Sequence, residues 1–189
     1  MPKTNTVEKP QEIYQIKVTL LGMDPPIWRR LLVPADLTLE QLHHVLQLAM
    51  GWEDCHLHEF RIAQQRFGTP DPMEQVFGGS RTASERTARL FNVLSRAGTK
   101  AVYTYDFGDS WEHQIVVEKR LAPEPGCLYP VCLAGERHGP PEDCGGIPGF
   151  SIFWRRSAIR STSNMKNSWT GWATISIRRL FRSKRSTDG

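Results

Sequence analysis

The chain has 189 residues, of which 39% are hydrophobic and 23% are charged. This length fits one domain, or one domain with an appendage, and the apolar content excludes a wholly disordered chain. No run of 18 apolar residues occurs, which excludes a membrane-spanning helix. The N-terminal residues lack the apolar stretch of a secretion signal, and four cysteines without export favour reduced thiols. We therefore expect a globular protein of the cytoplasm.

In the first half of the chain, hydrophobic alternation and one helical pattern define the elements. Thr38 and Gln41 have the spacing of a capping box, which predicts where the helix begins. Its apolar positions recur at helical spacing up to Gly51, a residue typical of a helix end. The elements predicted here are strands over 13–22 and 27–33, a helix from Thr38 to Gly51, and a strand over 56–63.

The second half alternates between turn-rich segments and clear strands. Two strands flank the tight turn Phe107-Gly108-Asp109-Ser110, a pattern that predicts a hairpin. The elements predicted here are a long surface loop over 66–86, a short helix over 87–97, strands over 100–106 and 111–121, and an irregular ribbon over 122–150. Together they predict an α+β fold, a compact single domain with a mixed or antiparallel sheet and two or three helices packed on it.

Charge is divided unevenly along the chain. Residues 1–150 carry 15 basic and 19 acidic residues, a net charge of −4. Residues 151–189 carry nine basic residues and one acid, a net charge of +8. This asymmetry is typical of a nucleic-acid-binding arm. We expect a disordered leader over 1–11, the α+β domain over 12–150, and a poorly ordered basic tail over 151–189.

Three segments contain residue types that could carry chemistry. His56 and His58 would share one side of a strand, where two imidazoles can ligate a metal. Asp106 and Asp109 flank the hairpin turn, and His113 follows on the next strand, as in a carboxylate-oriented imidazole. Proline and glycine stiffen the loop that presents two further carboxylates and a thiol. The candidate cluster is His56, His58, Asp106, Asp109, Trp111, His113, Glu142, Asp143 and Cys144, with His56, His58 and His113 as weak metal ligands.

Structural explanations remain open for each of these segments. The histidines at 56 and 58 could be surface residues beside a helix end, and the aspartates could bond their own turn. His113 could lie half-buried beside Trp111, and the thiols of Cys127, Cys132 and Cys144 could be buried without any ligand. The motifs of P-loop proteins, dinucleotide-binding enzymes, zincins and α/β-hydrolases are absent, which argues against those classes.

Five separate motifs, in the same order, resemble the plasmid pRiA open-reading-frame-three-like family. They are Ile27-Trp28-Arg29-Arg30, Leu42-His43-His44 through Ala49-Met50-Gly51-Trp52, His56-Leu57-His58-x-Phe60, Tyr105-Asp106 through Glu112-His113, and Tyr129-Pro130 through Pro140-Pro141-Glu142-Asp143-Cys144-Gly145-Gly146. The resemblance covers about residues 11–150. It implies a compact α+β domain found on plasmids, mobile elements and bacterial chromosomes, and no established activity. Members also carry the label of insertion-element passenger proteins of the TnpR kind, but this chain shows no recombinase pattern.

The chain departs from that family at two places. Relatives often carry a second cysteine where this chain has His138-Gly139. Relatives also end with an acidic helix and a Gly-Asp-x-x-Asp-Pro-Glu-x-Phe segment, which residues 150–181 do not show. Codons compatible with this tail can be read two nucleotides later as an acidic ending of that kind. We therefore predict that an insertion or deletion in the coding DNA replaced the native C-terminus.

Three functions follow from these observations, in order of preference. The first is a non-enzymatic interaction or accessory module of a mobile element, with an unknown protein partner. The second is a metal-dependent or acid/base enzyme that uses the candidate cluster, for which the acidic body would favour a divalent cation. The third, nucleic-acid binding through the basic tail, is not favoured because residues 1–150 are acidic. A common position for the 56–58 segment, the 106–113 hairpin and the 140–146 loop would favour the second.

Overall fold

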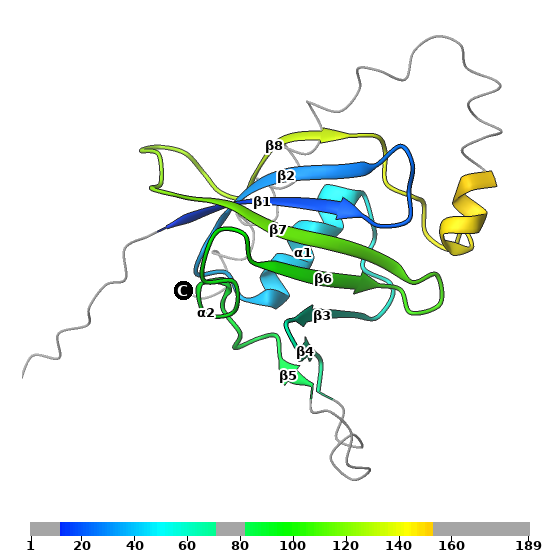
Figure 1. Ribbon diagram of the computed structural model, residues 1–189, viewed down its shortest axis with the longest axis horizontal. Helices are drawn as coiled ribbons and strands as arrows, with labels where there is room; N and C mark the ends of the chain where they lie inside the picture. The colour runs from blue at the N-terminus through cyan, green and yellow to red at the C-terminus, as the bar shows by residue number, and fades with distance from the viewer. Residues whose placement is uncertain (1–11, 71–81, 153–189) are drawn as a thin grey trace, which may run out of the picture.

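A computed structural model describes residues 12–70 and 82–152 of the chain (Figure 1). The predicted leader over 1–11 and the tail from residue 153 onward lie outside these described residues. The elements are β1 (Ile13–Leu20), β2 (Ile27–Pro34), α1 (Leu39–Met50), β3 (His58–Ile62), β4 (Gln65–Gly68), β5 (Ala83–Ser84), α2 (Leu90–Val93), β6 (Lys100–Tyr105), β7 (Trp111–Leu121) and β8 (Val131–Glu136). A further helical segment begins at residue 146 and includes residue 152. None of the described helices is long and apolar enough to cross a membrane.

The strands form one eight-stranded sheet in the order β5-β4-β3-β6-β7-β1-β2-β8. All neighbouring strands are antiparallel except β4 and β5, which are parallel. The sheet is therefore mixed, which confirms the predicted α+β class. In the register, Tyr105 lies opposite both His58 of β3 and Trp111 of β7. The end of β6 and the beginnings of β3 and β7 consequently meet at one end of the sheet.

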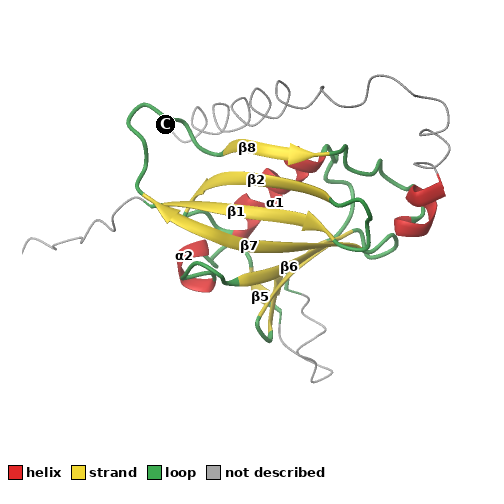
Figure 2. Ribbon diagram, turned by 45° about the horizontal axis from the view of Figure 1, so that its top comes forward, coloured by secondary structure: helices red, strands yellow, loops and turns green. Residues whose placement is uncertain are grey.

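Helix α1 packs against one face of the sheet (Figures 1 and 2). Its beginning is the predicted capping box, in which the Thr38 hydroxyl accepts a hydrogen bond from the Gln41 backbone and the Gln41 side chain accepts one from Thr38. It ends at Gly51, whose φ of 86° is the left-handed conformation that glycine adopts most easily. The apolar stripe of α1 is buried, and its packing on the sheet provides most of the core.

The two faces of the sheet differ in burial. Along β1, β2 and β7, buried residues alternate with half-buried ones, so one side chain in two points away from α1. Among the described residues, the face away from α1 keeps this partial exposure throughout the central strands. The hydrophobic core therefore lies between α1 and one face, and the other face is open.

Three predicted segments differ from the structure. The predicted loop over 66–86 contains most of β4 and all of β5, which are too short for a periodicity signal; β4 forms a tight hairpin with β3, and β5 pairs with β4. The predicted helix over 87–97 is reduced to α2, whose first turn has no side-chain cap. The predicted ribbon over 122–150 contains β8, an edge strand that tolerates irregular pairing with β2.

Candidate functional site

Three segments that are far apart in the sequence converge at the end of the sheet where β6 ends. They are the segment 51–57 after α1, the turn 106–110 between β6 and β7, and the loop 140–146. Their meeting is the arrangement that sequence analysis named as the test for a metal site. We refer to the five side chains brought together there as the His56 cluster, which consists of Cys55, His56, Asp106, Glu142 and Asp143.

The Nε2 atom of His56 is the centre of this cluster. It lies 3.2 Å from Oδ1 of Asp143, 3.7 Å from Oδ2 of Asp106 and 3.7 Å from Oε2 of Glu142. Atoms bound to one ion at 2.0–2.2 Å stand about 3.3–3.6 Å apart in a tetrahedral site. The observed separations lie near this range, and they are also those of a histidine that forms ion pairs with carboxylates.

Two of these donor atoms have no hydrogen-bond partner among the described residues. Nε2 of His56 and Oε2 of Glu142 are both buried, and neither forms a hydrogen bond. Leaving a buried polar atom unpaired costs about 1–3 kcal/mol. A cation placed between them would satisfy both, because an imidazole nitrogen and a carboxylate oxygen both donate lone pairs to a metal.

The segment 51–57 is fixed by its contacts rather than by regular structure. Trp52 is buried in the hydrophobic core, where its ring stacks on Tyr105 with centroids 4.7 Å apart. The Trp52 indole N–H donates to the carbonyl oxygen of Pro140 at 2.9 Å, which ties this segment to the loop 140–146. Asp54 has a positive φ of 59°, and its backbone N–H donates to the Gln47 side chain. These contacts place His56 between the other two segments.

The hairpin turn orients Asp106. Its Oδ1 accepts hydrogen bonds from the backbone N–H groups of Gly108 and Asp109, at 2.9 and 3.3 Å. Its own backbone N–H donates to Leu57, which holds the turn against the segment that carries His56. Because the turn occupies Oδ1, Oδ2 is left to face His56. Asp106 therefore bonds to its own turn through Oδ1, as the structural explanation predicted, and also faces His56 through Oδ2.

Glu142 is held in the same manner. Its Oε1 accepts a hydrogen bond from the Tyr105 hydroxyl at 3.0 Å and from the Glu53 backbone N–H at 3.0 Å. Burial raises the pKa of Tyr105 far above its usual range, with further contributions from Cys55 and Glu142, so the hydroxyl keeps its proton. Partners that occupy one carboxylate oxygen and orient the other are typical of the outer shell of metal sites.

The loop 140–146 is locked onto the hairpin turn by Asp109. Its Oδ2 accepts a hydrogen bond from the Gly145 backbone N–H at 3.1 Å. A Cβ atom at Gly146, where φ is 64°, would lie 2.7 Å from the Asp109 carbonyl oxygen. The loop can therefore approach the turn only with glycine at this position, and Asp109 positions the loop rather than contacting His56.

The remaining predicted site residues lie outside the cluster. Trp111 is fully buried and packs edge-on against Phe150. Cys144 is half-buried in the loop, where burial, followed by the charge of Asp109, raises the pKa of its thiol. A raised pKa keeps this thiol protonated at neutral pH, which makes it a poor metal donor.

His58 and His113, two of the three predicted metal ligands, also occupy different surroundings. His58 pairs with Glu85 through Nε2 at 2.8 Å and stacks on His43 with ring centroids 3.5 Å apart. His113 is fully buried, and burial lowers its pKa to about 4. The prediction that His56 and His58 lie on one side of a strand assumed that the strand includes both residues. Strand β3 begins at His58, so strand alternation does not extend back to His56.

The candidate cluster predicted from the sequence did not include Cys55, Tyr105 or Trp52. Trp52 and Cys55 precede the predicted His56 in the same short segment, and Tyr105 directly precedes Asp106. It also overlooked a second buried polar group, in which His43 contacts Asp54 at 2.7 Å and the Tyr103 hydroxyl at 2.8 Å. The Asp54 carboxylate accepts from Nε2 of His43, and burial lowers the His43 pKa to about 4, so the neutral ring accepts from the Tyr103 hydroxyl through Nδ1.

The arrangement of the His56 cluster suits a divalent cation open to solvent on one side. Asp106 and Glu142 are mostly buried, whereas the Asp143 side chain is 76% exposed. Three carboxylates around one imidazole attract positive charge. An ion bound there would keep room for water, whose pKa a metal lowers, or for an external ligand.

The fold and this site define an α+β protein with one open, mixed sheet and a histidine–carboxylate cluster at the sheet's end. The chain belongs to the plasmid pRiA4b ORF-3-like protein family, whose model matches residues 12–180. The match confirms the resemblance seen in the sequence. It also includes thirty residues past position 150, where sequence analysis placed the end of the domain. Replacement of the native C-terminus stays a prediction. Sequencing the coding DNA across codons 145–155 tests it.

Two relatives illustrate the family. An uncharacterized protein, y4hQ of Sinorhizobium fredii (strain NBRC 101917 / NGR234), is 40% identical over 141 residues, which are 75% of this chain and 71% of the relative. The crystal structure of a protein of unknown function, MM3350 from Methanosarcina mazei Go1, has a TM-score of 0.70 at 36% identity. That match covers 79% of this chain and 83% of the other. These similarities show the family and the fold, and neither relative's description names an activity.

Proposed function

We propose that this protein binds a divalent metal ion at the His56 cluster, with His56 as a ligand and the other donors drawn from Cys55, Asp106, Glu142 and Asp143. The observation that carries the proposal is the pair of buried atoms, Nε2 of His56 and Oε2 of Glu142, that face each other without a hydrogen bond. An imidazolium ion paired with these carboxylates would donate a hydrogen bond from Nε2. A metal ion bound between His56 and Glu142 accounts for the absence of that bond.

Metal binding by the purified full chain tests the proposal. We expect one ion per chain after dialysis against Zn²⁺ or Mn²⁺, measured by elemental analysis and by calorimetric titration. The variant His56→Ala should lower affinity by more than the roughly 10- to 100-fold that loss of an outer-shell partner causes. His138→Ala, which removes an exposed imidazole that belongs to none of the described donor groups, is the matched control and should bind as the wild type does. Equal affinity of His56→Ala and the wild type would exclude the site.

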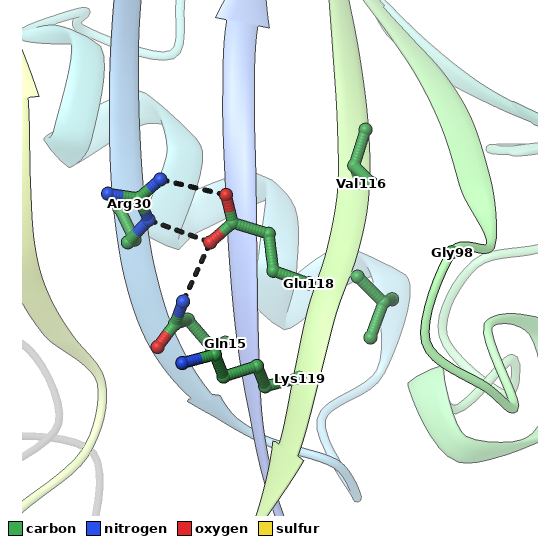
Figure 3. A pocket seen from close by; sticks show the side chains of 7 residues that line it. Gln15, Arg30, Gly98, Val116, Glu118 and Lys119 are labelled. Atoms are coloured by element: carbon green, nitrogen blue, oxygen red, sulfur yellow. Dashed lines mark hydrogen bonds and ion pairs between the residues drawn. The ribbon is translucent and has the colours of Figure 1, made fainter.

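The open face of the sheet favours a second candidate function, the interaction module first predicted from the sequence. Trp28 is half-buried on this face, with the Lys17 ammonium 5.0 Å and the Arg30 guanidinium 5.3 Å from its ring centroid. Beside it lies a shallow depression in which Arg30 and Glu118 form a two-bond ion pair (Figure 3). Tryptophan and arginine are the residues most often dominant in protein interfaces.

Capture of partners from a host lysate tests this second function. A protein that binds this face should be enriched by the wild type and lost with Trp28→Ala, because a central interface tryptophan contributes about 2 kcal/mol or more. His56→Ala should retain it, since the His56 cluster lies at the sheet's end and shares no residue with the depression. Enrichment that Trp28→Ala leaves unchanged would exclude this face as the binding surface.

A further inference from the structure

The His56 cluster contains two overlapping sets of three donors, and both include His56. In the sulfur-containing set, Cys55, His56 and Glu142 place their donor atoms within 4.8 Å of one another. In the carboxylate set, His56, Asp106 and Asp143 do the same. The two sets differ in chemical softness, because one contains a thiol and the other contains two carboxylates.

Metal ions differ in the donors they prefer. Thiolate and imidazole suit Zn²⁺, whereas carboxylate and water suit Mn²⁺, Mg²⁺ and Ca²⁺. We propose that the ion selects the donor set: Zn²⁺ binds through Cys55, His56 and Glu142, and a harder ion such as Mn²⁺ binds through His56, Asp106 and Asp143. This inference rests on the proposed metal-binding function and identifies which ions the site accepts, and through which atoms.

The sulfur-containing set is the better prepared of the two. Both unpartnered buried atoms, on His56 and Glu142, belong to it. The Tyr105 hydroxyl accepts from the Cys55 backbone N–H at 3.1 Å and donates to Glu142, so one residue holds two of the three donors. The Cys55 side chain is exposed, which allows an ion to reach it from solvent. We therefore expect Zn²⁺ to bind more tightly than Mn²⁺.

The carboxylate set is more exposed to solvent than the sulfur-containing set is at His56 and Glu142. Asp106 is buried and oriented by its turn, but Asp143 is mostly exposed and adopts a positive φ of 51° in the loop. An ion held there would remain largely hydrated, which Mn²⁺ and Mg²⁺ tolerate and tetrahedral Zn²⁺ sites avoid. Binding of Zn²⁺ also releases the Cys55 thiol proton to solvent, since a thiolate is the ligand, and Mn²⁺ binding releases none from this residue.

Reciprocal variants test this division. In calorimetric titrations of the full chain, Cys55→Ser should weaken Zn²⁺ binding at least about 10-fold and leave Mn²⁺ binding within about twofold. Asp143→Asn should weaken Mn²⁺ binding at least about 10-fold and leave Zn²⁺ binding within about twofold. Cys127→Ser, which changes a half-buried thiol outside the described donor sets, is the control and should alter neither ion. Loss of both ions, or of neither, with Cys55→Ser would overturn the inference, as would a wild type that binds Zn²⁺ and no Mn²⁺.

A spectroscopic measurement on the wild type keeps the inference testable even if a variant fails to fold. The protein loaded with Co²⁺, which replaces Zn²⁺ in sites of this type, should show a near-ultraviolet sulfur-to-cobalt charge-transfer band. A Co²⁺ protein without that band would overturn the role of Cys55. Failure of the wild type to bind any of the three ions is a separate result, because it would exclude the proposed function itself.

Discussion

At the scale of single residues, Tyr105 organises the site without being a metal donor. Its hydroxyl joins the Cys55 backbone to the Glu142 carboxylate, and its ring stacks on Trp52. This one side chain therefore connects the segment 51–57 with the loop 140–146. No sequence feature of a tyrosine directly before a turn predicts that it will join two distant segments.

The variant Tyr105→Phe should separate packing from orientation. The ring remains stacked on Trp52, but Glu142 loses the hydrogen bond that holds Oε1. We expect Zn²⁺ affinity to fall about 10- to 100-fold, the usual effect of losing an outer-shell partner. Calorimetric titration measures the change. Tyr103→Phe is the control, because among the described residues the Tyr103 hydroxyl bonds to Gln47 and His43 and to no donor of the His56 cluster, and it should keep wild-type affinity. Equal losses in both variants would contradict the role of Tyr105.

At the scale of elements, the loop 140–146 depends on one close backbone approach. Gly146→Ala would place a Cβ atom 2.7 Å from the Asp109 carbonyl oxygen, at a φ of 64°. We expect lower thermal stability and weaker metal binding, because the loop must move away from the hairpin turn. Gly98→Ala is a matched control, since Gly98 also has a positive φ of 84° but no atom within 4 Å of the added Cβ.

The two glycine variants share the backbone strain of about 1 kcal/mol that a left-handed conformation causes in alanine. Any additional loss in Gly146→Ala therefore measures the clash with Asp109. Thermal unfolding followed by circular dichroism gives the stability of each. Equal unfolding temperatures for the two variants would show that the loop is free to move from the turn.

Elements with local signals were predictable from the sequence, and those that depend on distant pairing were not. The capping box of Thr38 and Gln41 lies within four residues, so the start of α1 was correct. Strands β4 and β5 are too short for periodicity to detect, and β8 is defined by pairing with β2, about a hundred residues earlier in the chain. For the same reason, no pattern indicated that Glu85 would meet His58.

The candidate site was predictable in part. Asp106, Glu142 and Asp143 were included because turns and stiff loops expose such side chains, and His56 because of a predicted pairing with His58 on one strand; the structure places these four near one another. His113 was included because it follows the hairpin turn. Its alternation with half-buried neighbours on β7 equally predicted the buried position that it occupies.

At the scale of the whole molecule, two buried histidines couple stability to pH. Burial lowers the pKa of both His43 and His113 to about 4, with neighbouring His58 as a further cause for His43. In the unfolded chain both would titrate near 6.5. As the pH falls below that value the unfolded chain binds protons first, so stability is complete above about pH 6.5 and is lost toward pH 4.

Urea unfolding at about pH 7.5 and pH 4.5 measures this loss, which we expect to be on the order of 3 kcal/mol per histidine. His113→Phe should reduce the dependence on pH, because one of the two titrating groups is removed. His138→Gln changes an exposed imidazole that contributes to the pKa of neither buried histidine and should leave the dependence intact. Stability that is unchanged between the two pH values would show that these histidines protonate without unfolding.

The three segments of the His56 cluster are separated by about fifty and thirty-five residues of chain. No short peptide cut from this sequence can supply all the donors, so an ion bound with high affinity reports that the native topology has already assembled. By mass action, Zn²⁺ at 100 times its dissociation constant would raise the free energy of unfolding by about 2.7 kcal/mol. A thermal-shift screen across metal salts would thus rank the ions and verify correct folding in a single measurement.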